Sequence, residues 1–389
     1  MRKGWVGALL GLVLALALAE GQEDHGHGGE KLYTRVAVAD AEKPVVAVYD
    51  EEGKELGRFT VPSPAALYSL PGGQYVLMVH RDGDAVGFLY GGLDLEDHGE
   101  HKDVKPKNPY VAATLRTGPK PTHAHVGEPW LAVFHDGDGT VALFDLRRLG
   151  LDLTPRLVAT GGADHGAVVL LGETLLVGTL EGGRVEAYTL GGTRVLALPE
   201  ACPRLHGEAV LGEVAAFGCA DGVLLVEQRG RGLLGRKLPY PPGSPQGARV
   251  GVLASHPAHP FLVGNFGQGL LFVFPKEGRL EALPLPARPL AFAFDPDGKA
   301  PYVLTADGRL HRLDPKERRV VASLEAVSPE AQGAPTARMA VGHGVAFVTD
   351  PVKGEVVRVQ LDRFQVSGRF SVGGKPMNIA LFQVEGVEH

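Results

Sequence analysis

The stretch TVALFD at residues 140–145 is short, apolar and rich in β-branched and aromatic residues, and it follows a turn containing Asp138 and Gly139. Such a run between turn residues predicts a β-strand. Similar runs recur along the chain at intervals of roughly 40–45 residues, the spacing of a propeller built from four-stranded blades. The eight copies are residues 45–49, 85–90, 140–145, 184–188, 223–226, 270–274, 309–314 and 355–359.

We therefore predict an all-β chain that forms a single β-propeller of eight four-stranded blades. No stretch after residue 20 keeps a helical apolar period. After the last blade-like unit, residues 377–382 have the pattern of an inner strand, and residues 33–38 have the pattern of a second strand. Pairing these two ends would close the ring and remove the exposed sheet edges. Seven blades are the alternative, because residues 248–294 can be divided differently.

The overall composition agrees with a ring of short strands and limits the function. The chain has 389 residues with 54 Gly and 29 Pro, and eight blades account for all of it as one domain. The formal net charge is −6 and no basic run occurs, which argues against nucleic acid as a partner.

The N-terminus predicts export to the periplasm. Residues 1–3 are a basic n-region, residues 5–18 an apolar h-region, and Ala17-Leu18-Ala19 fits the cleavage rule for signal peptides. We divide the chain into a signal peptide (1–19, cleaved near Ala19), a disordered His-containing segment (20–32) and the propeller (33–389). Nothing later is apolar enough to span a bilayer, so we expect no membrane insertion, and we expect a monomer.

Only two cysteines occur, Cys202 and Cys219. Cys202 lies just before an inner strand, and Cys219 lies on the strand expected to pair with it. Because export permits disulfides, we predict a Cys202–Cys219 bridge. Two buried free thiols are the alternative.

Four histidines fall in the same part of three consecutive repeats, at or near the link that leads into the first strand of a blade. They are His123, His125, His165 and His206. In a propeller these links surround one central mouth, so residues about 40 positions apart would meet there. Chance would place about one histidine in eight such links. The alternative is that these side chains cap turns or pack against the channel wall.

Converging neutral imidazoles suit zinc, and we predict a zinc site at this mouth. His123 and His125 point to the same side of an extended segment, so we expect both to bind the ion. Copper and nickel also accept imidazole and remain open as alternatives. Asp164 or Glu208 could orient a ligand or replace one.

Histidines also occur outside these links. Residues 24–28 follow the cleavage site, and residues 96–103 lie in a long acidic loop between the third and fourth strands of one blade. We predict auxiliary metal binding by His98 and His101, with a solvated acidic loop as the alternative. Blade topology puts this loop on the face opposite the histidine mouth. His80 and His135 occupy matching turns and belong to the repeat.

These features resemble the AztD-type periplasmic zinc metallochaperones. The resemblance rests on the signal peptide, the His-containing N-terminus and the links Thr122–His125, Ala163–Gly166 and Leu205–Gly207. It implies a β-propeller that binds Zn²⁺ and delivers it to the solute-binding protein of a zinc ABC transporter, with no enzymatic activity. It also implies that His123, His125, His165 and His206 carry the zinc site.

The alternatives are an exported propeller enzyme, lactonase or quinoprotein-like, or a metal-free protein-binding scaffold. A lactonase-type site needs carboxylate and amide ligands for a calcium-like ion on the inner strands, which in this chain are mostly apolar. A quinone cofactor site would require Trp-rich docking motifs, and only Trp5 and Trp130 occur.

Overall fold

The computed structural model describes residues 31–99, 101–230 and 232–388. Within them the chain forms 34 strands and two short 3-10 turns, Arg81–Gly83 and Leu146–Arg148. The predicted signal peptide lies outside the described residues, as does all of the His-containing segment except Lys31 and Leu32, which already belong to the first strand. The described residues contain no helix long and apolar enough to cross a membrane.

The strands form eight blades, and each blade runs from an inner strand at the channel to an outer strand at the rim. The first blade has β4 (Ala66–Ser69), β5 (Tyr75–His80), β6 (Ala85–Tyr90) and β9 (Tyr110–Leu115). The second has β10 (Pro121–Val126), β11 (Trp130–His135), β12 (Thr140–Asp145) and β13 (Arg156–Ala159). The third has β14 (Gly166–Leu171), β15 (Thr174–Thr179), β16 (Val185–Thr189) and β17 (Arg194–Ala197), and the fourth β18 (Glu208–Leu211), β19 (Val214–Cys219), β20 (Gly222–Arg229) and β21 (Gly232–Pro239).

The remaining blades repeat this order. The fifth has β22 (Leu253–Ser255), β23 (Leu262–Phe266), β24 (Gly269–Phe274) and β25 (Arg279–Pro284). The sixth has β26 (Pro289–Phe294), β27 (Pro301–Thr305), β28 (Arg309–Asp314) and β29 (Arg319–Glu325), and the seventh β30 (Met339–Gly342), β31 (Val345–Asp350), β32 (Glu355–Gln360) and β33 (Gln365–Ser371). The closing blade joins both ends of the chain, with β34 (Pro376–Glu388), β1 (Lys31–Asp40), β2 (Val45–Asp50) and β3 (Glu55–Thr60).

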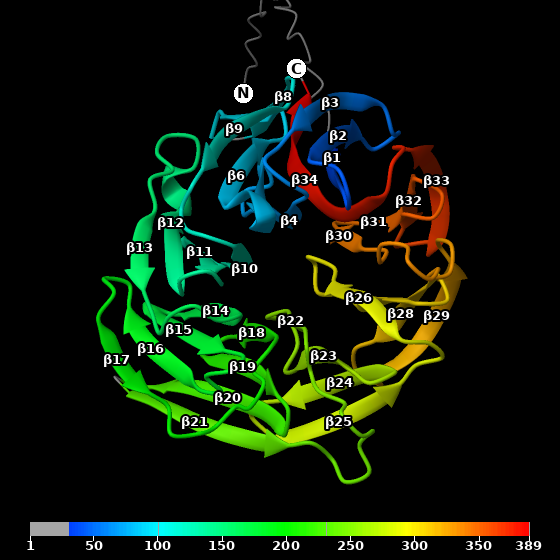
Figure 1. Cartoon of the computed structure of the whole chain (residues 1–389). Coiled ribbons are helices and arrows are strands. Elements are labelled where there is room, and N and C mark those ends of the chain that lie inside the picture. Colours follow the sequence, from blue (N-terminus) through cyan, green and yellow to red (C-terminus); the bar gives the residue numbers. More distant parts are fainter. Residues whose placement is uncertain (1–30, 100, 231, 389) are drawn as a thin grey trace, which may run out of the picture.

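The eight-bladed propeller is therefore confirmed, and each apolar run that predicted it is the third strand of a blade (Figure 1). Strand β12 shows why these runs are apolar at successive positions. Val141 and Leu143 pack in a core shared with the third blade, whereas Ala142 and Phe144 pack in a core shared with the first. Because both faces of a blade are buried against neighbours, alternate side chains enter different cores and both sets must be apolar.

Pairing between the chain ends closes the ring as predicted. Strand β34 pairs antiparallel with β1 in a long register that includes Val36 opposite Leu381 and Tyr33 opposite Val384. The inner strand of this blade thus comes from the C-terminal region and the other three from the N-terminal region (Figure 1). The closure gives every blade a neighbour on each face.

The acidic His-containing segment is a β-hairpin rather than a loop. Strands β7 (Leu93–Asp97) and β8 (Lys102–Pro106) pair with each other, and β8 adds in parallel to the end of β34. The Arg35 guanidinium holds the base of the hairpin by donating to the carbonyls of Gly91 and Lys107, each at 2.7 Å. The sequence did not predict this hairpin, because its register is completed by a strand nearly 300 residues away in the chain.

The directions of the strands place the link into each blade at the same end of the channel as the turn between the second and third strands of that blade. Pro121 at the start of β10 is opposite His135 at the end of β11, so the link into a blade lies beside the turn between its second and third strands. The β6–β9 connection, which carries the hairpin, leaves from the other end of its blade. The histidine links and residues 136–139 therefore share one mouth, and the β7–β8 hairpin lies at the opposite end.

Three further histidines are buried in the repeat. His80 and His135 are fully buried and His311 is 2% exposed. His135 contacts the Thr117 hydroxyl and the Thr140 carbonyl, and His311 contacts the hydroxyls of Thr305 and Ser323. Burial lowers the pKa of all three imidazoles, because it disfavours the charged form.

These neutral histidines should make the fold sensitive to acid. An unfolded histidine binds a proton near pH 6.5, whereas the folded ones resist protonation, so the free energy of unfolding should fall as pH drops below about 6.5. In urea titrations between about pH 7.5 and about pH 5.5, His135→Gln should reduce this slope by up to about 1.4 kcal/mol per pH unit. A slope equal to that of the wild-type protein would contradict the prediction.

Candidate metal centre

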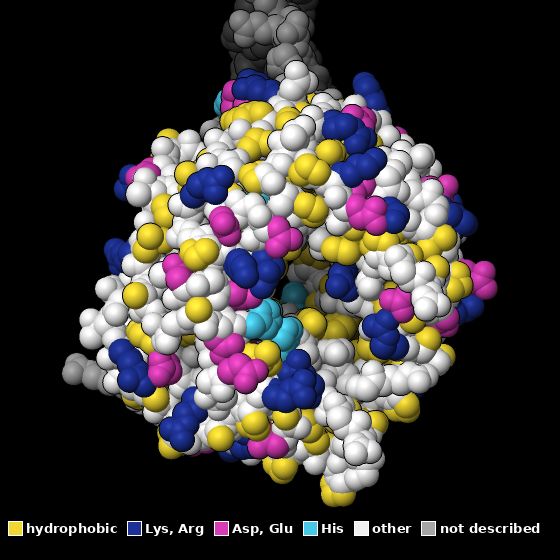
Figure 2. Space-filling view, in the orientation of Figure 1, with side chains coloured by type: hydrophobic (Ala, Val, Ile, Leu, Met, Phe, Trp, Pro, Cys, Tyr) yellow, Lys and Arg dark blue, Asp and Glu magenta, His cyan; other side chains and the backbone are white. Residues whose placement is uncertain are grey.

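Three of the predicted histidines converge at one edge of the central opening. Within residues 31–99, 101–230 and 232–388, His123, His165 and His206 are the one group of potential ligands whose donor atoms all lie within 4.8 Å of one another. Their ring centroids are 4.9, 5.2 and 5.0 Å apart, so the three rings form a nearly equilateral triangle. Figure 2 shows histidine side chains gathered at this opening, with acidic and basic side chains around them.

Each of these rings has an acceptor at its Nδ1 atom. Nδ1 of His123 lies 3.3 Å from Oε1 of Glu208, Nδ1 of His165 lies 2.9 Å from Oδ2 of Asp136, and Nδ1 of His206 lies 2.7 Å from the Gly251 carbonyl oxygen. A neutral imidazole that donates from Nδ1 carries its lone pair on Nε2. The Nε2 atoms of His123 and His165 face each other, and a ring nitrogen of His206 lies within 4.8 Å of both side chains' donor atoms, an arrangement that a bound cation stabilises.

The spacing of the donor atoms fits a tetrahedral ion. The Nε2 atoms of His123 and His165 are 3.3 Å apart. Nitrogen ligands at about 2.0–2.1 Å in a tetrahedron lie about 3.3–3.4 Å from each other. Three protein ligands leave a fourth position for water or for a ligand from another molecule.

The carboxylates of Asp136 and Glu208 lie directly behind two of the histidine rings and add negative charge to the site. Asp136 has a side chain only 4% exposed and also accepts from Arg81 at 3.0 Å. Burial is the largest single effect and would raise the pKa of Asp136, but the hydrogen bond and charge of His165, with the hydrogen bonds of Thr122 and Arg81, together lower the pKa. For His123, burial is the largest single effect and favours the neutral ring, yet the hydrogen bond with Glu208 and the charges of Glu208 and Asp136 together raise its pKa. These carboxylates would therefore also stabilise a metal cation bound to the rings.

Local backbone contacts fix the links that carry the ligands. Asp164 accepts from the backbone amides of His165, Glu181 and Gly182, so it ties the third-blade link to the neighbouring turn. Asp164 thus acts on the backbone, whereas Glu208 contacts a ligand ring directly. Gly207 has a φ of +80°, and a Cβ there would lie 2.6 Å from the carbonyl carbon of Gly251. Only glycine fits where these two segments cross beside His206.

His125 lies outside the three-histidine group. Its ring nitrogens do not belong to the set of donor atoms of His123, His165 and His206 that all lie within 4.8 Å of one another. Nε2 of His125 instead lies near Gly127, where a Cβ would be 3.4 Å away. Burial lowers the pKa of His125, so the ring is neutral. The structure therefore brings together three of the four histidines that the sequence suggested.

Sequence reasoning missed two groups that support the ligands, Asp136 and the Gly251 carbonyl. Asp136 directly follows His135, in a turn already recognised as part of the repeat, and this turn shares the mouth with the next histidine link. Topology alone could therefore have suggested Asp136. Gly251 carries no side chain, so residue type gave no signal for it.

His98 and His101 form a separate cluster on the β7–β8 hairpin. Nε2 of His98 lies 3.1 Å from Oδ2 of Asp103, and Nε2 of His101 lies 3.1 Å from Oδ1 of the same carboxylate. The ring centroids of the two histidines are 5.6 Å apart. Because the hairpin leaves from the opposite end of its blade, these rings do not join the mouth cluster.

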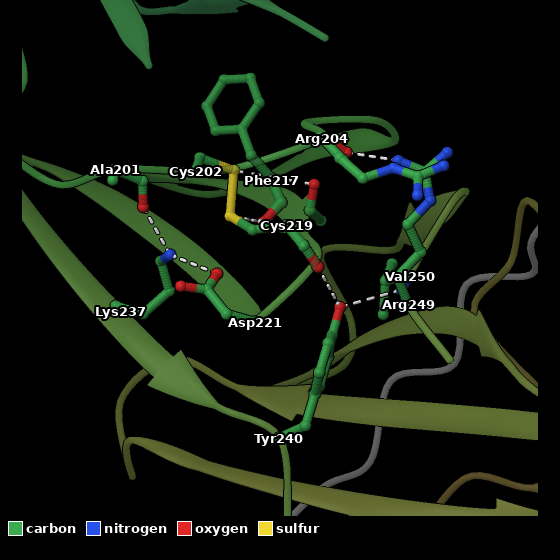
Figure 3. Close-up of a disulfide and its surroundings, with 11 residues drawn as sticks. Ala201, Cys202, Arg204, Phe217, Cys219, Asp221, Lys237, Tyr240, Arg249 and Val250 are labelled. Carbon is green, nitrogen blue, oxygen red and sulfur yellow. Dashed lines mark hydrogen bonds and ion pairs between the residues drawn. A yellow bond between two sulfur atoms is a disulfide. The ribbon is translucent and has the colours of Figure 1, made fainter. Parts of the chain in front are cut away.

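Cys202 and Cys219 are joined as a disulfide in the structure, with both residues fully buried (Figure 3). Cys202 lies in the link that carries His206, and Cys219 ends β19, next to the same mouth. The disulfide therefore lies beside the segment that carries His206.

Comparison with known proteins relates the whole chain to a zinc chaperone. No protein-family model matches the chain. The zinc chaperone AztD of Citrobacter koseri is 27% identical over 370 residues, which cover 91% of this chain and 88% of that protein. The structure of apo AztD from Citrobacter koseri has a TM-score of 0.82 and covers 92% of this chain and 100% of that one.

A dihydro-heme d1 dehydrogenase, NirN, has a TM-score of 0.62 at 12% identity, covering 90% of this chain and 74% of that one, and shows likeness of fold alone. The AztD similarity extends over nine-tenths of the chain in both sequence and structure. The resemblance predicted from the histidine links is thereby confirmed: the chain resembles the AztD zinc chaperones.

Proposed function

We propose that the protein is an exported zinc chaperone that carries zinc on His123, His165 and His206 and delivers it to the solute-binding protein of a zinc ABC transporter. The observation that carries this proposal is the convergence of three imidazoles, with donor atoms within 4.8 Å of one another, whose Nδ1 atoms all contact acceptors. The tetrahedral spacing of His123 and His165 supports zinc over metals with a square-planar preference.

The position of the site supports handover to another protein. The side chains of His123 and His165 are 20% and 30% exposed, so the cluster is half-buried but open to the mouth. A partner's ligand can enter the fourth coordination position before the protein's own histidines leave. Zinc would then pass between proteins through a shared intermediate and would not need to be released into solvent.

The remaining assignments belong to the same proposal. Residues 1–19 serve as a signal peptide cleaved near Ala19, residues 20–30 precede the propeller, whose first strand begins at Lys31, and the mature protein is a periplasmic monomer. A buried disulfide supports an oxidising compartment. His98 and His101, with Asp103 between them, provide an auxiliary site for loosely held zinc at the other end of the ring.

One observation favours a second candidate, a zinc hydrolase. Three histidines with an open fourth position are also the ligand pattern of some catalytic zinc sites. Similarity to a protein named a zinc chaperone favours carriage over catalysis. Hydrolysis of an activated ester by the zinc-loaded protein, lost in His165→Ala, would support the enzyme instead.

Removing one ligand should abolish tight zinc binding without harming the fold. We expect His165→Ala to weaken zinc binding by more than about a hundredfold, because it removes a ligand and not only a supporting contact. The melting temperature of the zinc-free protein should stay near the wild-type value, and zinc should no longer raise it. Competition with a chromophoric chelator measures the affinity, and His343→Ala, on an exposed turn, serves as the control.

A His165→Ala protein that still held one tight equivalent of zinc would show that the ion binds elsewhere. The auxiliary cluster is then the first place to test, by His98→Ala with His101→Ala.

Zinc should be released steeply in mild acid. Each imidazole must be neutral to bind, so three protons compete with one ion below about pH 6.5. The apparent affinity should fall by up to about a thousandfold per pH unit once all three rings protonate. Zinc retention measured after equilibration at several pH values tests this. A site that kept its zinc to roughly pH 4 would have carboxylate ligands.

Transfer to the acceptor should be faster than spontaneous release. Mixing the zinc-loaded protein with the zinc-free solute-binding protein and an excess of chelator separates the two routes. Direct handover predicts that the acceptor gains zinc faster than the chelator does when the acceptor is absent. If the chelator intercepted all of the zinc at the spontaneous rate, the protein would act as a zinc store and not as a chaperone.

A further inference from the structure

His206 is held differently from the other two ligands. Carboxylate side chains orient His123 and His165, whereas the Nδ1 atom of His206 donates to a backbone carbonyl, that of Gly251, at 2.7 Å. A side-chain carboxylate can rotate to follow a histidine ring, but a backbone carbonyl can move only if its backbone segment moves. The orientation of the His206 ring therefore depends on where two backbone segments lie, residues 202–207 and residues 249–252.

The disulfide fixes the first segment. It joins Cys202, at the start of the His206 link, to Cys219, at the end of β19. Beside it, the amide of Ala220 donates to the carbonyl of Pro203 at 2.7 Å, and the amide of His206 donates to the carbonyl of Gly218 at 3.0 Å. The link is thus attached to β19 at both of its ends, covalently at one and by hydrogen bonding at the other.

The Tyr240 hydroxyl connects the second segment to the same strand end. It donates to the carbonyl of Cys219 at 2.8 Å and accepts from the amide of Val250 at 2.9 Å (Figure 3). The Asn265 side chain accepts from the amides of Gly251 and Val252 at 3.0 and 2.7 Å. The carbonyl that orients His206 is therefore held through Cys219, one partner of the disulfide.

We infer that the Cys202–Cys219 disulfide and the Tyr240 hydroxyl form a clamp that positions His206 for zinc binding. The clamp brings the link and the Gly251 carbonyl to one fixed point, the end of β19. It does for the fourth blade what Asp164 does for the third, where a carboxylate ties the histidine link to the adjacent turn. This inference rests on the proposed function, because it assigns the clamp a role only if His206 binds the ion.

A double-mutant cycle separates this role from plain stabilisation of the fold. The first change is Cys202→Ser with Cys219→Ser, which removes the bond and leaves no free thiol to bind zinc. The second change is His206→Ala. Zinc affinity is measured by chelator competition, and the melting temperature of the zinc-free protein is measured for all four proteins.

We expect the serine double variant to bind zinc about tenfold more weakly or worse, the size of effect seen when ligand-orienting partners are lost. In the His206→Ala background, the same change should cost no further affinity. The melting temperature should fall equally in both backgrounds, since the disulfide stabilises the fold whether or not His206 is present. Tyr240→Phe should weaken zinc binding in the same His206-dependent way, and Tyr188→Phe, whose hydroxyl contacts Glu186 on the third blade, should not.

Two outcomes would overturn the inference. One is a folded serine variant with wild-type affinity, and the other is an equal loss of affinity in both backgrounds. If the serine variant does not fold, Tyr240→Phe alone decides, because it removes one hydroxyl and keeps the disulfide. The proposed function fails in a different way, with His206→Ala binding zinc as tightly as the wild-type protein, and this result would overturn the clamp as well.

Discussion

Closure of the ring by β1 and β34 is the constraint on which the rest of the structure depends. Each blade is apolar on both faces, so it is stable only between two neighbours, and the pairing of the chain ends supplies the last neighbour. Closure also sets the radius of the channel, and with it the distance between equivalent positions on adjacent blades. His123, His165 and His206 come from three successive blades and meet only because the ring holds those blades at a fixed spacing.

Electrostatics then decides what the converging rings can bind. Acceptors at the three Nδ1 atoms leave the Nε2 lone pairs for a ligand, and those of His123 and His165, 3.3 Å apart, repel each other unless a cation lies between them. The carboxylates of Asp136 and Glu208 contribute charge as well as orientation, and they belong to the second and fourth blades, so the site links blades to each other. Arg81 forms an ion pair with Asp136, so these contacts between blades also reach the first blade. The ion would thus add cross-blade attraction at the mouth, whereas the apolar cores alone hold the blades in its absence.

Much of the fold and of the metal site could be predicted from the sequence. The features that could not be predicted were missed for physical reasons. The third strands were recognisable because burial on both faces makes them uniformly apolar, and the links of His165 and His206 followed from the repeat. The pattern put His125 on the same side of its strand as His123, but it could not show that only His123 joins the three-histidine group, because that depends on how each side chain is directed. Asp136 and the Gly251 carbonyl act across blade boundaries, through side-chain reach and backbone position that a one-dimensional pattern does not contain. The β7–β8 hairpin was not predicted because it pairs with β34, which is far away in the sequence.

The proposed carrier would have to bind its ion tightly and still release it to a partner, and two different parts of the structure would serve these demands. Rigidity comes from behind the ligands, where buried contacts to Asp136, Glu208 and Gly251 hold each ring, so little ordering is needed when zinc binds. Access comes from the opening, where histidine side chains are visible at the surface (Figure 2), and a group of three ligands would leave a fourth coordination position for a partner's ligand. A partner could therefore approach a bound ion without disturbing the supports, and the rings could give up zinc one at a time. If the fold does not depend on the ion, as the His165→Ala experiment tests, the empty protein would keep the same site ready for the next one.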